Sequence, residues 1–222
     1  IPSQTIILPA GLAFYAQTIE PENKFDPASK NWSIKVEWEG AAREAVEKML
    51  GHLPLEALET KKAEMIEEAR AKRNKVDELK YEQMTYELPW RAVMNKETAE
   101  PTGAIEMVFK RPELKMDRFT KTKVPNSPPY VCDKALAPFL RPIPNRSLVI
   151  VKFATWPVYF PADNKAGIKR LLESIQVVSL PTARRPDASG FEAMEPDHDD
   201  ETDHAPSARE GAAQAAAPGA DY

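Results

Sequence analysis

Apolar and polar side chains alternate along residues 31–38, which is the period of a strand with one buried face. The apolar members of this run are Trp32, Ile34, Val36 and Trp38. Further β-rich runs lie at residues 11–19, 81–94, 102–110, 147–156 and 171–180. Because such runs recur along the first 180 residues, the pattern predicts a body that is mainly β.

The apolar period changes between residues 41 and 80. Apolar side chains recur at helical spacing from Ala42 to Leu50, and Gly51 provides a C-cap. From Leu55 to Lys80 an apolar stripe runs among charges of both signs, as in a helix that packs on one side only. We therefore expect an inserted helical pair at about residues 41–80, with a scaffolding role because its glutamates would repel phosphate.

Residues 111–146 show neither period. This stretch is rich in proline, which punctuates loops. It is predicted to form a long arm or loop, and its prolines include Pro125, Pro128, Pro129, Pro138, Pro142 and Pro144.

The last 37 residues have a different composition from the body. From Pro186 onward the sizeable apolar side chains are Phe191, Met194 and Tyr222, among many Ala, Asp, Glu, Pro, Gly and Ser residues. So little apolar area does not offset the entropy lost on ordering. We expect one domain at residues 1–185 and a disordered acidic tail at residues 186–222.

The net charge of −4 is the sum of two regions of opposite sign. Residues 1–185 carry 29 basic and 24 acidic side chains, whereas residues 186–222 carry one basic and ten acidic. The two regions would present opposite fields to solution. The mildly basic body is compatible with a polyanionic partner.

Several function classes are disfavoured by what the sequence contains. The single cysteine, Cys132, forms no intrachain disulfide and fits a reducing cytoplasm, and no apolar run is long enough for a transmembrane helix. His198 and His204 lie among the tail carboxylates without a rigid frame for a metal. Because no phosphate-loop, dinucleotide or nucleophile-elbow motif occurs, we expect no catalysis, no cofactor and no metal.

Three segments together resemble the single-stranded DNA-binding proteins of tailed bacteriophages. They are GLAFYAQTIEPENKFDPASKNWSIKVEW at residues 11–38, PPYVCDKALAPF at residues 128–139 and SLVIVKFATWPVYFPADNKAGIKRLLESIQVVSL at residues 147–180. The acidic tail is similar too, although this chain ends in Asp221-Tyr222 where such proteins commonly end in Asp-Phe. A glycine-containing turn of the family is here Asn145-Arg146.

The resemblance implies a mainly β, OB-fold-type barrel that coats single-stranded DNA during phage replication, recombination and repair in the infected host cytoplasm. It also implies a flexible tail that competes with DNA and recruits a polymerase, helicase or primase. A homodimer is one arrangement that the sequence leaves open. The tail residues expected to contact partners are Asp197, Asp199, Asp200, Glu201, Asp203, Asp221 and Tyr222.

A protein that coats single strands needs cations that follow the phosphates and aromatic faces on which bases stack. Residues 91–180 carry 15 basic and only 8 acidic side chains. A solvated loop is as good an interpretation of the first basic cluster as DNA contact. Its predicted DNA-contacting residues are Lys110, Arg111, Lys115, Arg118, Phe119, Lys121 and Lys123.

A second cluster lies around residues 156–161, expected at a strand end and in a proline-bounded loop. Lys152 and Trp156 share a parity opposite to Val149 and Val151, so we expect both to leave the barrel surface together. At least one aromatic ring here is expected to stack on bases while others pack inward. The predicted contacts of this cluster are Lys152, Trp156, Tyr159, Phe160 and Lys165.

Three more candidates lie near the N-terminus. Tyr15 and Lys35 have outward parity in their strands, and Lys24 lies in the loop PENKFDP. Trp32 and Trp38 are expected in the core.

Two other functions stay open. A strand-annealing or duplex-binding replication accessory would share the basic face without stacking bases. A protein-docking β module would use its acidic tail only for solubility.

Overall fold

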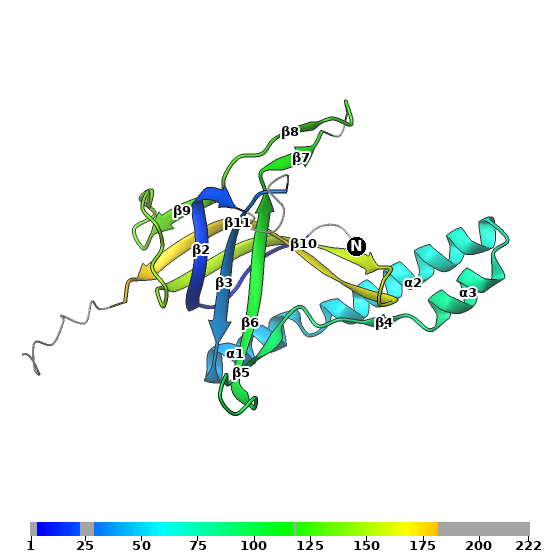
Figure 1. Ribbon diagram of the computed structural model, residues 1–222, viewed down its shortest axis with the longest axis horizontal. Coiled ribbons are helices and arrows are strands. Elements are labelled where there is room, and N and C mark those ends of the chain that lie inside the picture. The colour runs from blue at the N-terminus through cyan, green and yellow to red at the C-terminus, as the bar shows by residue number, and fades with distance from the viewer. Residues whose placement is uncertain (1–3, 23–28, 118, 182–222) are drawn as a thin grey trace, which may run out of the picture. The chain divides into compact units, whose positions relative to one another are not determined.

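The computed structural model describes residues 4–22, 29–117 and 119–181 (Figure 1). The predicted acidic tail, residues 186–222, lies outside the described residues. At the centre is a barrel built from β2 (Gly11–Glu22), β3 (Asn31–Trp38), β6 (Pro101–Pro112), β10 (Leu148–Phe160) and β11 (Lys165–Ser179).

The five barrel strands form a closed ring. They are hydrogen-bonded in the order β10-β2-β3-β6-β11, and β10 pairs with β11 to close the circle. All neighbours are antiparallel except β6 and β11, which run parallel and meet where Lys110 pairs with Leu171. A five-stranded Greek-key barrel of this kind is an OB-fold. The predicted mainly β, OB-fold-type barrel is therefore confirmed.

Shorter strands extend this sheet. β1 (Gln4–Ile7) pairs with β10, β5 (Arg91–Met94) pairs with β6, and β4 (Thr85–Tyr86) and β9 (Tyr130–Asp133) run parallel to β11. Separately, β7 (Leu114–Met116) and β8 (Lys123–Pro125) form a two-stranded ribbon.

Aromatic side chains fill the barrel. Trp38 and Phe109 meet edge to face at 6.4 Å between ring centroids, and Phe109 packs against Phe153 at 4.9 Å. The Trp38 Nε1 donates to the Pro9 carbonyl at 3.0 Å. A Cβ on Gly11 would lie only 2.5 Å from that nitrogen, so this close approach requires glycine. Because all inward residues of β3 are buried, the predicted parity of residues 31–38 is confirmed.

The helical insertion lies between β3 and β6 in the chain and comprises α1 (Gly40–Leu50), α2 (Leu53–Ala71) and α3 (Lys75–Glu82). Val46, Leu50, Leu53 and Ala57 belong to the barrel core, so the α1–α2 corner plugs one end of the barrel. The rest of α2 and α3 project from it as an arm (Figure 1). No described helix is long and apolar enough to cross a membrane.

The prediction of one helix from residue 55 to residue 80 is wrong. The helix is interrupted at Arg73, whose backbone is left-handed with φ 57°. Asn74 then caps α3 by accepting from the Asp77 backbone N–H at 3.2 Å.

Strand boundaries also differ from the prediction. The expected loop at residues 111–146 contains β7, β8 and β9, and the β-rich run at 81–94 yields only β4 and β5. The segment after Trp156 is strand rather than loop, because β10 continues to Phe160 and pairs with a β11 that begins at Lys165. Pro157 is tolerated because the pairing of β10 with β1 ends at Thr155, so the missing N–H faces no strand on that side.

The core packing predicts that alanine substitutions of two phenylalanines differ strongly in their effect on the free energy of unfolding. Phe109→Ala should lower the free energy of unfolding by about 3–5 kcal/mol, because it leaves a cavity between two other rings. Phe119→Ala is the matched control, because Phe119 is 93% exposed and its loss should leave stability nearly unchanged. Urea unfolding of both variants tests this; equal effects would contradict the described core.

Candidate nucleic-acid interface

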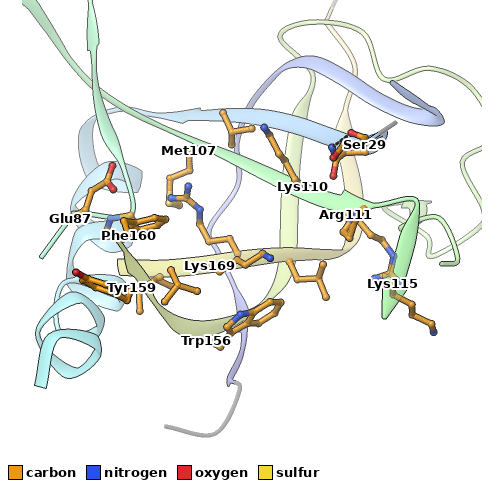
Figure 2. Close-up of a pocket in the computed structure, with 18 of the residues that line it drawn as sticks. Ser29, Glu87, Met107, Lys110, Arg111, Lys115, Trp156, Tyr159, Phe160 and Lys169 are labelled. Atoms are coloured by element: carbon orange, nitrogen blue, oxygen red, sulfur yellow. Dashed lines mark hydrogen bonds between the residues drawn. The ribbon is translucent and has the colours of Figure 1, made fainter. Parts of the chain in front are cut away.

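A groove of about 1360 Å³ runs between β6 and the end of the β10–β11 hairpin (Figure 2). We call it the hairpin groove. One wall is β6 together with β7, and the other is the hairpin from Trp156 to Leu171, with the β4–β5 connection at one end. Six cations and only two carboxylates line it. They are Arg91, Lys110, Arg111, Lys115, Lys169 and Arg170, with Glu87 and Glu106.

Three aromatic rings belong to the hairpin wall: Trp156, Tyr159 and Phe160. Trp156 pairs across the hairpin with Lys169, whose Nζ lies 5.5 Å from the indole centroid in a cation–π contact. Phe160 covers Gly167, where a Cβ would come within 2.7 Å of the phenyl ring. Trp156 and Phe160 have the same parity in β10, so both side chains leave one face of the hairpin, and both line the groove.

The hairpin wall is held in place by the helical arm. Tyr159 meets Tyr81 of α3 edge to face at 5.6 Å, and its hydroxyl lies 3.2 Å from the Asn164 Oδ1. Asn164, left-handed in the hairpin turn, donates from Nδ2 to the Lys80 carbonyl at 2.8 Å. Burial raises the pKa of Tyr81, which keeps this phenol neutral. Tyr159 therefore acts as an anchor between the arm and the groove.

On the opposite wall the exposed lysines are free. Lys110 and Lys115 are exposed and form no ion pair within the described part of the chain. Figure 2 shows Lys110 on the strand above Lys169 and Trp156. Such ammonium groups are available to a polyanion in the groove.

Arg111 behaves differently from these lysines, although it also lines the groove. Its guanidinium donates to the Ser127 carbonyl at 2.6 Å, the Ser127 Oγ at 3.2 Å, the Leu172 carbonyl at 3.1 Å and the Asn126 Oδ1 at 3.3 Å. With four donors occupied by protein acceptors, Arg111 ties β6 to β11 and to the segment before β9. These contacts favour a structural role over the predicted phosphate contact.

Lys35 and Tyr15 lie on the outer face of β2 and β3, outside the groove lining. The Lys35 Nζ is 2.6 Å from Glu37 and 2.8 Å from Glu106, and 5.6 Å from the Tyr15 ring. Burial lowers the pKa of Lys35, but the hydrogen bonds to both carboxylates outweigh it and the pKa is raised. With two carboxylates beside it, Lys35 offers little net charge to a phosphate.

The position of the exposed Tyr15 ring depends on a left-handed backbone conformation at this residue. Tyr15 has φ 50°, and its N–H donates to the Asn145 Oδ1 at 2.8 Å. Arg146 follows with φ 67°, so it adopts the left-handed backbone that a glycine would favour.

The other predicted contacts are scattered. Lys152 is outside the groove lining, although Trp156 is part of it. At Lys152 the strand β10 is paired on both sides, with β1 and with β11, and the Lys152 Nζ lies 3.7 Å from the Glu173 carboxylate. Lys165 pairs with Phe160 and is also outside the lining. Lys24 and Arg118 lie outside the described residues.

The β7–β8 ribbon carries Phe119, Lys121 and Lys123, also outside the groove lining. Its turn is fixed by Asp117, whose carboxylate accepts from the Phe119 and Thr120 N–H groups at 2.9 and 2.8 Å. Backbone hydrogen bonds from Thr120 and Phe119 lower the Asp117 pKa. Among the predicted contacts, the groove therefore brings together Lys110, Arg111, Lys115, Trp156, Tyr159 and Phe160.

Comparison with known proteins gives one kind of match. No protein-family model and no curated protein matches the chain. The crystal structure of gp2.5, a single-stranded DNA-binding protein encoded by bacteriophage T7, matches with TM-score 0.60 and 19% identity over 86% of this chain and 98% of that chain. A C-terminally truncated single-stranded DNA-binding protein from bacteriophage Enc34 matches with TM-score 0.50 and 12% identity over 80% and 86%.

The chain has the fold of these two phage proteins. In OB-folds, the face of the second and third barrel strands and the loops that join strands one to two and four to five bind oligonucleotides. Among the described elements of this chain, these are β3, β6 and the β10–β11 turn. The hairpin groove lies on this surface, since β6 and the end of the hairpin form its walls.

Sequence reasoning missed three of the groove cations: Arg91, Lys169 and Arg170. The last two belong to β11, which was predicted to begin at Leu171. A usable signal was the length of the hairpin, because a strand that begins at Lys165 places Lys169 opposite Trp156. For Arg91 the sequence carries no such signal.

Proposed function

We propose that this protein binds single-stranded DNA along the hairpin groove, without sequence preference and without catalysis. The observation that carries the proposal is the pairing of flat rings on one wall with unpaired lysines on the other. Bases stack on rings such as Trp156, each stack contributing about 1–3 kcal/mol, while Lys110 and Lys115 attract the phosphates. The shared fold of two phage single-stranded DNA-binding proteins supports the same function.

The groove favours single strands over a duplex for a geometric reason. A ring stacks on a base only when the face of that base is free, and the bases of a duplex are already stacked on one another. A strand-annealing or duplex-binding accessory would instead need only the cations. Equal affinity for single-stranded and duplex oligonucleotides of the same length would therefore favour that alternative.

Trp156 provides a direct test. Adding oligothymidine should quench the tryptophan fluorescence, and the dissociation constant should rise steeply with salt because bound phosphates release counterions. Trp156→Phe should remove most of the quenching yet retain binding, since phenylalanine still stacks. Trp156→Ala should weaken binding about tenfold or more. Affinity is measured independently by the anisotropy of a labelled oligonucleotide.

The matched control is Trp90→Phe, because Trp90 is partly buried against the barrel core and is not in the groove lining. This variant should retain the quenching. Salt-independent binding, or quenching that survives in Trp156→Phe, would refute the proposed interface. If oligothymidine does not change the tryptophan fluorescence of the wild-type protein, the result would favour a protein-docking module.

The tail at residues 186–222 is proposed to compete with DNA for the groove and to recruit replication proteins such as a polymerase, helicase or primase. Its one basic and ten acidic residues give it a charge opposite to that of the groove. The candidate contacts are those predicted from the sequence, from Asp197 to Asp203 and at the terminal Asp221 and Tyr222. The protein would then act in DNA replication, recombination and repair in the infected host cytoplasm, with a homodimer as one possible assembly.

Removal of the tail tests the competition. A chain ending at residue 185 should bind single-stranded DNA more tightly at low salt, and the gain should shrink at high salt because the repulsion is screened. Anisotropy titrations of both chains at two salt concentrations measure this. Unchanged affinity in the shortened chain at low salt would remove the competition from the proposal.

A further inference from the structure

Two arginines in the hairpin groove are in opposite situations. Arg111 has four hydrogen bonds to protein acceptors, as described above. Arg170, on β11, lines the same groove and is partly buried, yet forms no hydrogen bond and no ion pair with any described residue. Buried polar groups, and charged ones above all, are normally paired. Arg170 is therefore a charge that the protein partly removes from water without giving it a hydrogen bond or an ion pair among the described residues.

The charges around Arg170 offset only part of this cost. Burial lowers the pKa of Arg170 most, Glu87 raises it by less, and Arg91 lowers it again. Glu87 is shared, because its carboxylate is 4.0 Å from the Arg91 guanidinium. Two guanidinium groups thus face one carboxylate at the end of the groove where the β4–β5 connection meets the hairpin.

The backbone places the Arg170 side chain on the face of the hairpin opposite to the Trp156–Lys169 pair, although all three residues line the groove. Arg170 pairs with Thr155, the neighbour of Trp156, and the next residue, Leu171, pairs with Lys110 of β6. Thr155 is buried, so this part of the hairpin is rigidly packed. An anion bound by Arg170 would therefore lie at a fixed point of the groove, toward Arg91 rather than beside the Trp156 ring.

We propose that Arg170, assisted by Arg91, is a phosphate-binding site that holds one phosphodiester of the bound strand. The planar guanidinium offers forked donors that match the oxygens of a phosphate, which a lysine cannot do. The groove lysines, such as Lys110, are exposed and supply only diffuse attraction. This inference rests on the proposed function for its ligand, a nucleic-acid phosphate, but the unpartnered guanidinium is a property of the free protein.

We expect the unpaired charge of Arg170 to lower the stability of the free protein, because it is kept for binding and not for folding. Arg170→Met removes an unpaired, partly buried charge and keeps an apolar stem of similar length, so the Tm of the full-length protein should rise by about 2 °C or stay unchanged. Arg111→Met is the control, since it removes four satisfied hydrogen bonds and should lower the Tm. A fall in Tm for Arg170→Met comparable with that of Arg111→Met would show a structural role and overturn the proposal.

Ligand binding is tested first with an inorganic probe. Sodium pyrophosphate should raise the Tm of the wild-type protein more than sodium chloride or sodium acetate at equal ionic strength. The difference should disappear in Arg170→Met and persist in Lys96→Met, which removes an exposed lysine outside the groove. A pyrophosphate effect that persists in Arg170→Met, or an equal effect of acetate, would contradict a phosphate site.

Oligothymidine then separates this inference from the proposed function. Arg170→Met should bind about tenfold more weakly, and its plot of log affinity against log salt should be shallower by about 0.7, the value for one phosphate contact to a single strand. If wild type and Arg170→Met bind oligothymidine equally well, the result supports binding of single-stranded DNA and contradicts a phosphate site at Arg170. If pyrophosphate stabilises only proteins that retain Arg170, while neither the wild type nor any variant binds oligothymidine, the result supports the phosphate site and contradicts the proposed function.

Discussion

The pairing of β10 with β11 along their whole length is the constraint on which the rest of the structure depends. From Leu148 to Phe153 this pairing closes the barrel, and its inward side chains join the core. The register then shifts between Lys152 and Phe153, and the same two strands continue to Phe160 and Lys165, where they form a wall of the groove. The interactions that fold the barrel thus also set the position of Trp156.

The helical insertion gives this extended hairpin its support. A two-stranded ribbon alone is marginally stable in water. Here Tyr159 packs on Tyr81, and Asn164 links the hairpin turn to the end of α3. The arm therefore acts as a buttress that holds the rings before any strand binds, which lowers the cost of ordering them on binding.

The parts of the fold that the sequence predicts are those where one face is buried. Trp32 to Trp38 and Val149 to Phe153 alternate because the core requires it, so the pattern reveals both strands. Beyond Phe153 burial no longer alternates along β10, since Ala154 and Thr155 are both buried, and Pro157 makes the next residues resemble a loop. The helix break at Arg73 is likewise invisible to an apolar period, because the stripe continues across it.

The site was predictable in composition but not in geometry. Counting cations identifies a basic region, yet it treats Arg111, whose donors are occupied, and Lys110, which is free, as equals. Lys152 has the parity of Trp156 but is separated from the groove, since it pairs between two other strands. Which cation is available depends on hydrogen-bond partners far away in the chain, and these follow only from the tertiary structure.

Photocrosslinking shows whether a bound strand lies along the hairpin groove. An oligonucleotide in which thymines are replaced by 5-bromouracil is bound to the full-length protein, irradiated, and mapped by peptide mass spectrometry. We expect the major adduct on Trp156 or its hairpin neighbours Tyr159 and Phe160. Adducts confined to Tyr15 on the outer face of the barrel, or to Phe119 on the β7–β8 ribbon, would contradict binding along the groove.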